Sequence, residues 1–270
     1  MHPFEHAANW PVDTVAAGVT DANATLGEHG ETARVFPFAS VTKPLAAYAF
    51  LVAIDHGRVD LDEPAGPDGA TVRHLLAHAG GYDFDSDRLL AEPGERRIYS
   101  NTGFEVLGEL VEQRVGRPLP QFLRQQVLLP LGMSDTTLDG SPAAGAEGTV
   151  EDLLRFGREL LDPTLLDPDL YEEATTVVFP GLDGVLPGFG RQEPNDWGLG
   201  FEIKDGKEPH WTGSKNSPAT LGHFGQSGSF LWVDPDAELA CAALGSEPFG
   251  DWAREAWPLF SDAVLDEFGQ

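Results

Sequence analysis

The fold of this chain is constrained most by one run of residues that is apolar on every side. Residues 45–54 read LAAYAFLVAI and carry no charge. A helix that is apolar all round is buried in the core of a protein, and this run is too short to span a bilayer. It therefore predicts a central helix that ends near Gly57, a residue type favoured at helix C-termini.

Strand patterns lie near both ends of the chain, whereas helical patterns fill its middle. Strands are predicted at 12–20, 24–27, 199–203, 219–224, 229–233 and 239–244. Short strands are not stable alone, so those at the two ends are expected to pair into one antiparallel sheet. The sequence thus predicts an α+β fold in which this sheet is flanked by the apolar helix and by an amphipathic helix at 251–267.

This arrangement implies two subdomains. Residues 1–56 and 197–270 are predicted to form a sheet subdomain, and residues 57–196 a mainly helical subdomain inserted between its halves. Segment 162–196 is rich in Pro, Gly and Asp and is expected to be loop with little helix. The active site is expected in the cleft between the subdomains, with loops 57–70 and 162–196 as its walls.

Composition excludes several classes of partner. The formal net charge is −27 at pH 7, which argues against binding to nucleic acid or to anionic membrane surfaces. The single cysteine, Cys241, lies in an apolar run, so no disulfide can form within the chain. The N-terminal residues show neither the basic nor the apolar region of a signal peptide, and a cytoplasmic location is predicted. The sequence predicts no oligomeric state.

The apolar helix is preceded by the residues Ser40-Val41-Thr42-Lys43. Lys43 lies one turn after Ser40 and therefore on the same helix face. Burial favours the neutral form of a lysine amine, and a neutral amine beside a hydroxyl can accept its proton and activate it as a nucleophile. We therefore predict Ser40 as a nucleophile and Lys43 as its base.

A second candidate group is Tyr99-Ser100-Asn101, just before a predicted amphipathic helix at 102–115. A tyrosine in a helix-entry loop can reach a cleft, and a neighbouring lysine favours its phenolate form. Asn101 can donate and accept hydrogen bonds with an amide-like substrate. The alternative for Asn101 is a plain helix N-cap.

A third candidate group is His223-Phe224-Gly225, on a predicted strand that leads into Gln226-Ser227-Gly228. Glycine lets the backbone approach a ligand closely. The His-x-Gly pattern is weak by itself, because it also occurs at His78-Ala79-Gly80. We expect this strand to face the cleft.

The order of these groups resembles the serine β-lactamase and penicillin-binding-protein superfamily. The similarity is to the class C β-lactamase-related branch, which includes esterases, D-aminopeptidases and D-alanyl-D-alanine carboxypeptidases. It rests on Ser40-x-x-Lys43, Tyr99-x-Asn101 and His223-x-Gly225, and it extends to stretches such as VRHLLAHAGG, YSNTGFEVLGELVE and GHFGQSGSFLWVDP. The resemblance implies the β-lactamase/transpeptidase-like fold, in agreement with the predicted sheet and helical insertion.

The resemblance also implies a mechanism. Ser40 would attack an acyl carbonyl and form an acyl-enzyme, while Lys43 and Tyr99 share the serine proton. Tyr99 would then protonate the leaving group and activate water for deacylation. The backbone N–H groups of Ser40 and Gln226 would form the oxyanion hole.

The same resemblance implies substrate-binding roles for the remaining motif residues. Asn101 would orient the acyl side chain, and Gly225 and Gln226 would also bind the substrate. His223 would line the cleft and bind substrate by hydrogen bonds or, when protonated, by charge. No metal or organic cofactor is implied.

One departure from the family decides the predicted activity. β-Lactamases usually carry Lys-Thr-Gly where this chain has His223-Phe224-Gly225, and histidine there is more typical of the esterase and peptidase members. We therefore predict a serine hydrolase of the esterase or amidase type, acting on a small ester, amide or peptide. The alternatives are a β-lactamase or D-alanyl-D-alanine carboxypeptidase, and a catalytically silent ligand-binding relative.

The sequence offers two alternative candidate sites, a second serine nucleophile and a zinc site. Ser227 lies in Gly-Gln-Ser-Gly-Ser, which nearly fits the G-x-S-x-G elbow but lacks its last glycine and a βαβ context. His74 and His78 have the i, i+4 spacing of zinc ligands on a helix, but no third ligand is evident. Packing or capping is the expected role of both histidines.

Overall fold

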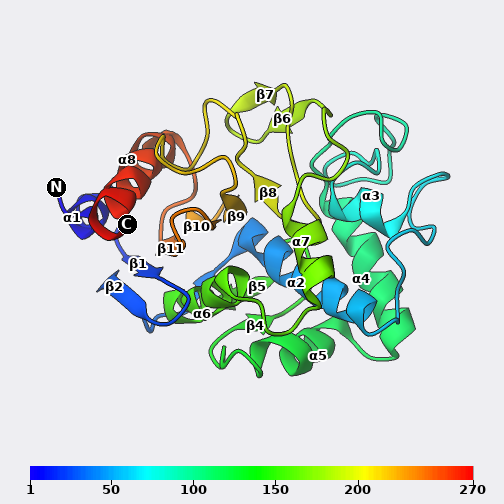
Figure 1. The fold of residues 1–270 in the computed structure, drawn as a ribbon, viewed down its shortest axis with the longest axis horizontal. Helices are drawn as coiled ribbons and strands as arrows, with labels where there is room; N and C mark the ends of the chain where they lie inside the picture. The colour runs from blue at the N-terminus through cyan, green and yellow to red at the C-terminus, as the bar shows by residue number, and fades with distance from the viewer. Residues whose placement is uncertain (270) are drawn as a thin grey trace.

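The apolar run forms the centre of helix α2 (Thr42–Asp55), whose residues from Thr42 to Ala53 are all buried. In the computed structural model, which describes residues 1–269, this helix crosses the middle of the molecule (Figure 1). It is preceded by a 3-10 turn, η1 (Ala39–Val41), that carries Ser40. The predicted core helix is therefore present, and it begins within two residues of the predicted nucleophile.

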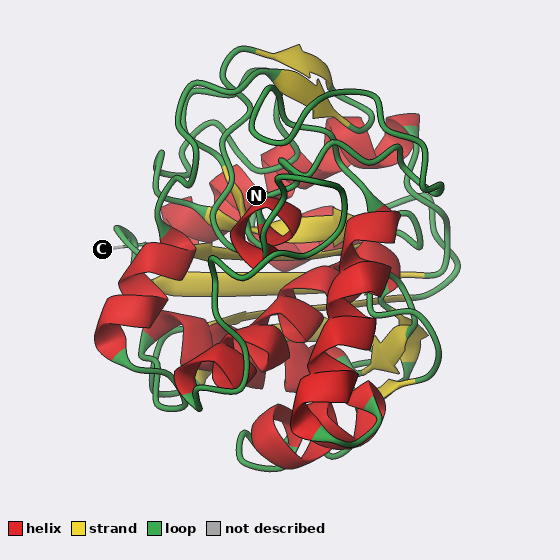
Figure 2. Cartoon of the chain, turned by 90° about the vertical axis from the view of Figure 1, so that its right-hand side faces the viewer, coloured by secondary structure: helices red, strands yellow, loops and turns green. Residues whose placement is uncertain are grey.

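Beside α2 lies an antiparallel sheet with the strand order β2-β1-β11-β10-β9-β8. The N-terminal strand β1 pairs with the C-terminal strand β11, so strands remote in sequence do join one sheet. The bounds of the strands are β1 (Val15–Thr20), β2 (Thr25–Gly30), β8 (Glu202–Ile203), β9 (Leu221–Gly225), β10 (Ser229–Asp234) and β11 (Leu239–Gly245). The long strands run through the middle layer of the molecule, between helices (Figure 2).

The two faces of the sheet are covered by different helices, because side chains alternate along each strand. On one face, Cys241 and Ala243 pack with Trp257 of α8 (Asp251–Phe268) and with α1 (Pro3–Ala8). On the other, neighbouring residues of β11 pack with α2 and with α6 (Val150–Leu161). Helix α6 contacts β1, β10 and β11 directly, although its residues fall within the range 57–196. The division into two subdomains stays a prediction.

The remaining elements lie outside this sheet, around α2. They are α3 (Val72–Leu76), α4 (Asn101–Val115), α5 (Leu119–Leu123), the π-helical turn η2 (Arg124–Leu128), α7 (Pro168–Thr175), a small sheet of β3 (Phe36–Pro37), β5 (Ala146–Gly148) and β4 (Thr137–Leu138), and the hairpin β6 (Gly184–Leu186) and β7 (Gly190–Gln192). Segment 162–196 is mostly loop, as expected, and holds one short helix, α7, and one short hairpin, β6 and β7. Its many Pro and Gly residues begin and end these short elements, as Pro168 begins α7 and Gly188 turns the hairpin with φ 79°.

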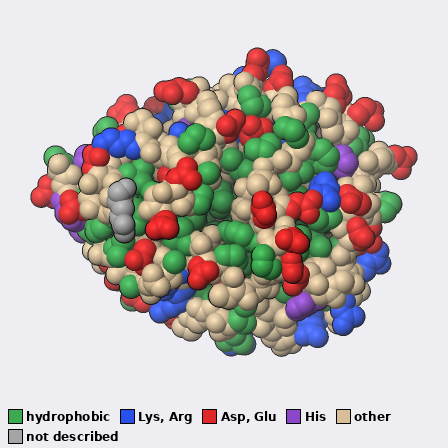
Figure 3. Space-filling model, viewed as in Figure 1, with side chains coloured by type: hydrophobic (Ala, Val, Ile, Leu, Met, Phe, Trp, Pro, Cys, Tyr) green, Lys and Arg blue, Asp and Glu red, His purple; other side chains and the backbone are tan. Residues whose placement is uncertain are grey.

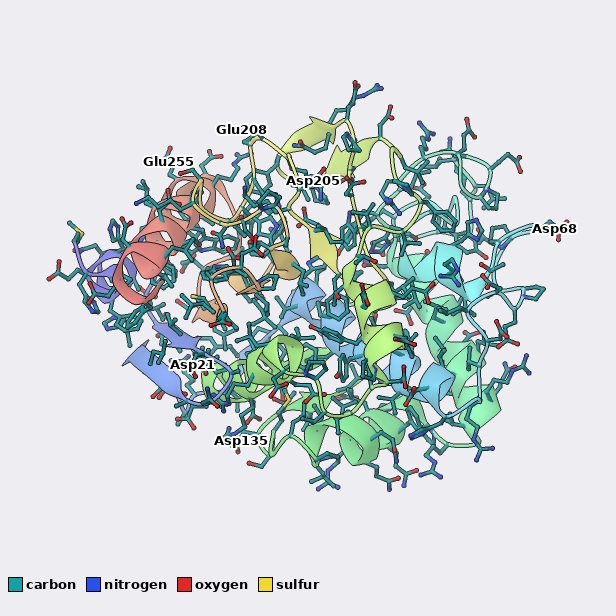
Figure 4. All side chains as sticks on the ribbon, viewed as in Figure 1. Asp21, Asp68, Asp135, Asp205, Glu208 and Glu255 are labelled. Carbon is teal, nitrogen blue, oxygen red and sulfur yellow. The ribbon has the colours of Figure 1, made fainter. Side chains whose placement is uncertain are left out.

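The surface reflects the acidic composition. Asp and Glu side chains are spread over the face in Figure 3, with apolar side chains toward its centre. The labelled carboxylates Asp68, Asp135 and Glu255 are exposed and lie at the outline of the molecule in Figure 4. Within the described residues, no helix combines the length and hydropathy needed to cross a membrane.

Candidate active site

Ser40 sits in a turn whose backbone is held in an unusual conformation. The preceding residue, Ala39, has φ 45°, in the left-handed region that residues other than glycine rarely adopt. The hairpin between β9 and β10 holds this turn: Ser229 Oγ donates to Phe38 O at 2.8 Å, and Ser227 Oγ donates to Pro37 O at 2.8 Å. The sheet thus fixes the position of Ser40 before α2 begins.

Lys43 lies in the first turn of α2 with its side chain fully buried. Its Nζ is 3.3 Å from Ser40 Oγ, 2.6 Å from Asn101 Oδ1 and 3.0 Å from Ala143 O. Burial lowers the pKa of Lys43 to about 7, although the negative charges of Asp85 and Glu105 partly oppose the change. The amine is therefore neutral in a large fraction of molecules near pH 7.

The environment of Lys43 differs from that of the other buried lysine, Lys207. Lys207 Nζ is 3.1 Å from a carboxylate oxygen of Glu202, which is buried with it. Within residues 1–269, no carboxylate oxygen lies within 4 Å of Lys43 Nζ. A buried charge is normally paired, so the unpaired amine of Lys43 is the one suited to be neutral.

Tyr99 completes a triangle of side chains with Ser40 and Lys43. Its OH is 2.8 Å from Ser40 Oγ, and Lys43 Nζ lies 4.6 Å from the centre of its ring. Burial raises the pKa of Tyr99 above its ordinary value. The expectation that the neighbouring lysine favours a phenolate is therefore wrong, because desolvation disfavours the anion more than a largely neutral amine can stabilise it.

Asn101 is the first residue of α4, but it is not the helix N-cap. Ser100 has that role, since its Oγ accepts a hydrogen bond from Gly103 N at 3.3 Å. The Asn101 side chain instead accepts from Lys43 through Oδ1 and donates through Nδ2 to Asp85 Oδ1 at 2.7 Å. The structure thus brings Asn101 to the predicted nucleophile and base, and it adds Asp85, which the sequence analysis missed.

His223 and Gly225 lie on β9, which packs against η1. The His223 ring is 5.5 Å from the Tyr99 ring, and its Nδ1 lies 2.6 Å from Phe224 O. That contact requires a proton on Nδ1, so Nε2 is the unprotonated nitrogen; it is buried without a partner among the described residues. Burial and the nearby Lys43 lower the pKa of His223 to about 3, so the imidazole is neutral at pH 7.

Gln226 follows β9 in the turn beside η1. Its side chain is exposed and donates to Phe249 O at 3.2 Å, so only its backbone N–H is suited to the predicted oxyanion hole. The pairing of that N–H with the N–H of Ser40 stays a prediction.

Two further aromatic residues border the same group, and one of them, His78, was expected to have only a packing or capping role. The Trp197 ring lies 6.0 Å from Tyr99 and 5.5 Å from His223, and the buried His78 ring lies 4.8 Å from Tyr99. His78 Nδ1 accepts a hydrogen bond from Ser100 N at 3.2 Å. The zinc alternative gains no support, because residues 1–269 hold no cluster of three potential metal ligands.

Gly225→Ala is expected to disturb the turn that carries the predicted nucleophile. A Cβ at Gly225 would lie 2.4 Å from Phe38 O and 2.4 Å from Ser229 Oγ. Overpacking of this kind costs about 1–3 kcal/mol, so the free energy of unfolding, measured in urea, should fall by that amount. Gly206→Ala is the matched control, since a Cβ at Gly206 meets nothing within 4 Å. Equal stability of the two variants would contradict the tight contact.

The comparisons with known proteins agree with this geometry. A family model described as Beta-lactamase matches residues 10–263. Penicillin-binding protein 4* of Bacillus subtilis (strain 168) is 27% identical over 188 residues, which cover 57% of this chain and 41% of that protein. Esterase EstB of Burkholderia gladioli is 31% identical over 167 residues, which cover 44% of this chain and 42% of that protein. This chain spans about two fifths of the length of these curated relatives.

Solved structures are similar over nearly the whole chain. A crystal structure described as a beta-lactamase from Mycobacterium bovis has a TM-score of 0.98 and 54% sequence identity, covering 99% of this chain and 100% of that chain. EstCE1, described as a hydrolase with promiscuous acyltransferase activity, has a TM-score of 0.80 and 20% identity, covering 96% and 95% of the two chains. The second likeness shows the fold alone, and together they confirm the predicted fold class.

Proposed function

This chain belongs to the Beta-lactamase family, and we propose that it is a serine hydrolase that forms an acyl-enzyme on a small ester or amide. Its relatives include proteins named as an esterase and as D-alanyl-D-alanine carboxypeptidases. The esterase or amidase type is the activity that the site geometry supports best.

One observation carries the proposal: the hydrogen bonds of Lys43 direct its lone pair. A neutral amine has two N–H donors and one lone pair. Asn101 Oδ1 and Ala143 O, at 2.6 and 3.0 Å, accept the two donors, which leaves the lone pair for the hydroxyl proton of Ser40 at 3.3 Å. A base with a pKa near the working pH, within hydrogen-bond reach of the nucleophile, is what general base catalysis requires.

In the proposed reaction, Ser40 Oγ bonds to the acyl carbon while its proton passes to Lys43 Nζ. The bond from the acyl carbon to the leaving oxygen or nitrogen then breaks, and the leaving group takes a proton through the phenol of Tyr99. That phenol contacts Ser40 Oγ at 2.8 Å and keeps its own proton at rest. Water then adds to the acyl carbon while Lys43 and Tyr99 take up its proton. The bond between the acyl carbon and Ser40 Oγ breaks, and Ser40 Oγ receives that proton, which releases the acid and restores the serine.

The neutral imidazole of His223 supports an ester over a β-lactam. β-Lactams and peptides ending in D-alanine carry a carboxylate, and a cation is the natural partner for it. With its pKa lowered to about 3 and its Nε2 buried, His223 offers no positive charge at pH 7. The similar structure described as a beta-lactamase favours β-lactam hydrolysis as the second candidate.

The proposal is tested with p-nitrophenyl butyrate and a chromogenic cephalosporin, followed by absorbance and by intact mass after rapid quenching. We expect ester turnover, a mass increase equal to the butyryl group, and peptide mapping of that group to Ser40. Faster turnover of the cephalosporin would favour the second candidate. A folded protein with neither adduct nor turnover would overturn the enzyme proposal in favour of a ligand-binding relative.

Asp85 is expected to set the pH at which the proposed base becomes active. Its negative charge raises the pKa of Lys43, so Asp85→Asn should lower that pKa and move the acidic limb of kcat/KM to lower pH. Asp85→Ala should move the limb in the same direction and also reduce the plateau, because Asn101 loses the acceptor that orients its amide.

The matched control for Asp85 is Asp87→Asn, an exposed carboxylate on the same loop. Its pH profile should coincide with that of the wild type, measured as kcat/KM for p-nitrophenyl butyrate from pH 5 to 9. A limb that stays in place in Asp85→Asn would show that the charge of Asp85 does not reach Lys43.

A further inference from the structure

An apolar cavity of about 400 Å³ lies beside Tyr99, and its other lining residues belong to none of the predicted motifs. Its walls are the loop before α4 and the hairpin strand β6, and its apolar lining residues include Phe84, Leu90, Ile98, Val185 and Pro187. Tyr99 lines it as well, and the Tyr99 OH contacts Ser40 Oγ. Tyr99 thus borders the cavity and also contacts the proposed nucleophile.

Apolar side chains are left exposed at this cavity. Phe84 is 47% exposed and Val185 is 59% exposed. Neither belongs to one of the two hydrophobic core clusters. The Phe84 ring stacks on the Tyr99 ring at 5.8 Å with an interplanar angle of 24°. Ligand pockets have volumes of about 300–1,000 Å³ and mostly apolar walls, so this cavity suits a small apolar group.

The cavity is fixed in place by backbone contacts. Phe84 O accepts a hydrogen bond from Asn101 N at 2.7 Å, which ties the loop to the start of α4. On the other wall, Arg97 N donates to Asp183 O at 2.8 Å and ties the loop to the start of β6. A group seated between Phe84 and Val185 would therefore be held at a constant distance from Tyr99.

The charged residues that line the cavity are of both signs. Arg97 is buried, and its guanidinium donates to the backbone oxygens of Asn195 and Val178. Arg96 donates to Leu90 O at 2.6 Å. Arg96, Arg97 and Asp83 line the cavity, and Asp85 and Asp87 lie in the same loop as Phe84, so the cavity presents no single sign of charge to pair with an ionic ligand.

We propose that this cavity binds the acyl chain of an uncharged carboxylic ester, and that Phe84 and Val185 determine the chain length accepted. The proposal rests on the acyl-enzyme function proposed above, because the chain must lie beside Tyr99 while Ser40 attacks its carbonyl. Asn101, which contacts the proposed base, is joined to Phe84 through the backbone. The acyl group is the occupant proposed here because it stays bonded to Ser40 after the alcohol has left.

The test measures kcat/KM for p-nitrophenyl acetate, butyrate and hexanoate in the wild type, Phe84→Ala and Val185→Trp. A buried methylene contributes roughly fourfold, so the wild type should prefer hexanoate over acetate by about tenfold or more. Val185→Trp fills the cavity and should remove this preference, and Phe84→Ala, which removes one apolar wall, should weaken it. Leu259→Ala, which changes a 59% exposed leucine on α8, should keep the wild-type preference.

Ester binding to a variant that cannot turn the ester over separates the cavity proposal from the hydrolase function on which it rests. In a Ser40→Ala background, Val185→Trp should weaken binding of p-nitrophenyl hexanoate about tenfold in calorimetry, and Leu259→Ala should not change it. Ester turnover without a chain-length preference would overturn the acyl cavity alone. Cavity-dependent binding without an acyl adduct in the wild type would overturn the hydrolase function alone, and equal binding by all variants would overturn the cavity assignment. A preference that follows the alcohol rather than the acyl chain would also overturn it.

Discussion

Ser40→Ala is expected to reduce kcat/KM for p-nitrophenyl butyrate by about 10⁴–10⁶-fold, as loss of a serine nucleophile does when it acts together with its base. The substitution removes only the Oγ that receives contacts from Lys43 and Tyr99 at 3.3 and 2.8 Å. Since Ser40 is only half-buried, the free energy of unfolding should change by about 1 kcal/mol or less. Intact mass should show no butyryl adduct.

Ser227→Ala is the matched control, because Ser227 lies in the rival nucleophile motif and reaches the same turn. Its Oγ donates to Pro37 O at 2.8 Å, so its loss should lower the rate by no more than about tenfold through a small movement of η1. The adduct should still map to Ser40. An adduct that survives Ser40→Ala and disappears in Ser227→Ala would transfer the nucleophile role to Ser227.

Two pairs of predicted site residues are placed by local spacing, whereas the resemblance to a known family was needed to join these pairs to each other and to His223. Ser40 and Lys43 are fixed relative to each other by one helical turn, and that turn is set by the apolar run that must be buried. Tyr99 and Asn101 flank the N-cap of α4, a position that a sequence signals clearly. Helix periodicity and capping therefore carry most of what was predicted about the centre of the site.

The missed features depend on contacts that no local pattern encodes. Asp85 reaches Asn101 because Phe84 O binds the start of α4, and a charged residue in an acidic loop gives no sign of this. The cavity beside Tyr99 is lined by residues of 83–99 and 184–187. The second range lies within the expected wall 162–196, whereas the first replaces the expected wall 57–70. The ionisation of Tyr99 was also misjudged, because the extent of its burial depends on Trp197 and His78, which come from distant segments.

Lys43→Met is expected to lower kcat/KM by about 10²–10⁴-fold, the range that a general base contributes. Methionine fills a similar apolar volume but has no lone pair of comparable basicity. In the wild type, kcat/KM should rise with pH through an apparent pKa near 7, because burial lowers the pKa of Lys43 to about 7 and the neutral amine is the active form. The residual activity of Lys43→Met should lack this limb. A variant that keeps the limb would assign it to another group.

The same pKa also predicts how stability changes with pH, which separates a catalytic lysine from a structural one. The unfolded chain holds the Lys43 proton up to a pKa of about 10.4, whereas the folded chain releases it near 7. Between these values the unfolded state binds more protons, so the wild type gains stability as pH rises. Relative to Lys43→Met, it should gain roughly 2–3 kcal/mol between pH 7.5 and 9.5, measured by urea denaturation at each pH.

This comparison of wild type and variant also removes the contribution of other groups that titrate in the same range. Burial raises the pKa of Tyr99 and Cys241, but both groups are present in the two proteins and cancel in the difference. If the difference stays constant with pH, the folded lysine is charged throughout and cannot be the base. A lysine that lowers stability at neutral pH, where the enzyme would need its amine, is best explained by selection for activity rather than for folding.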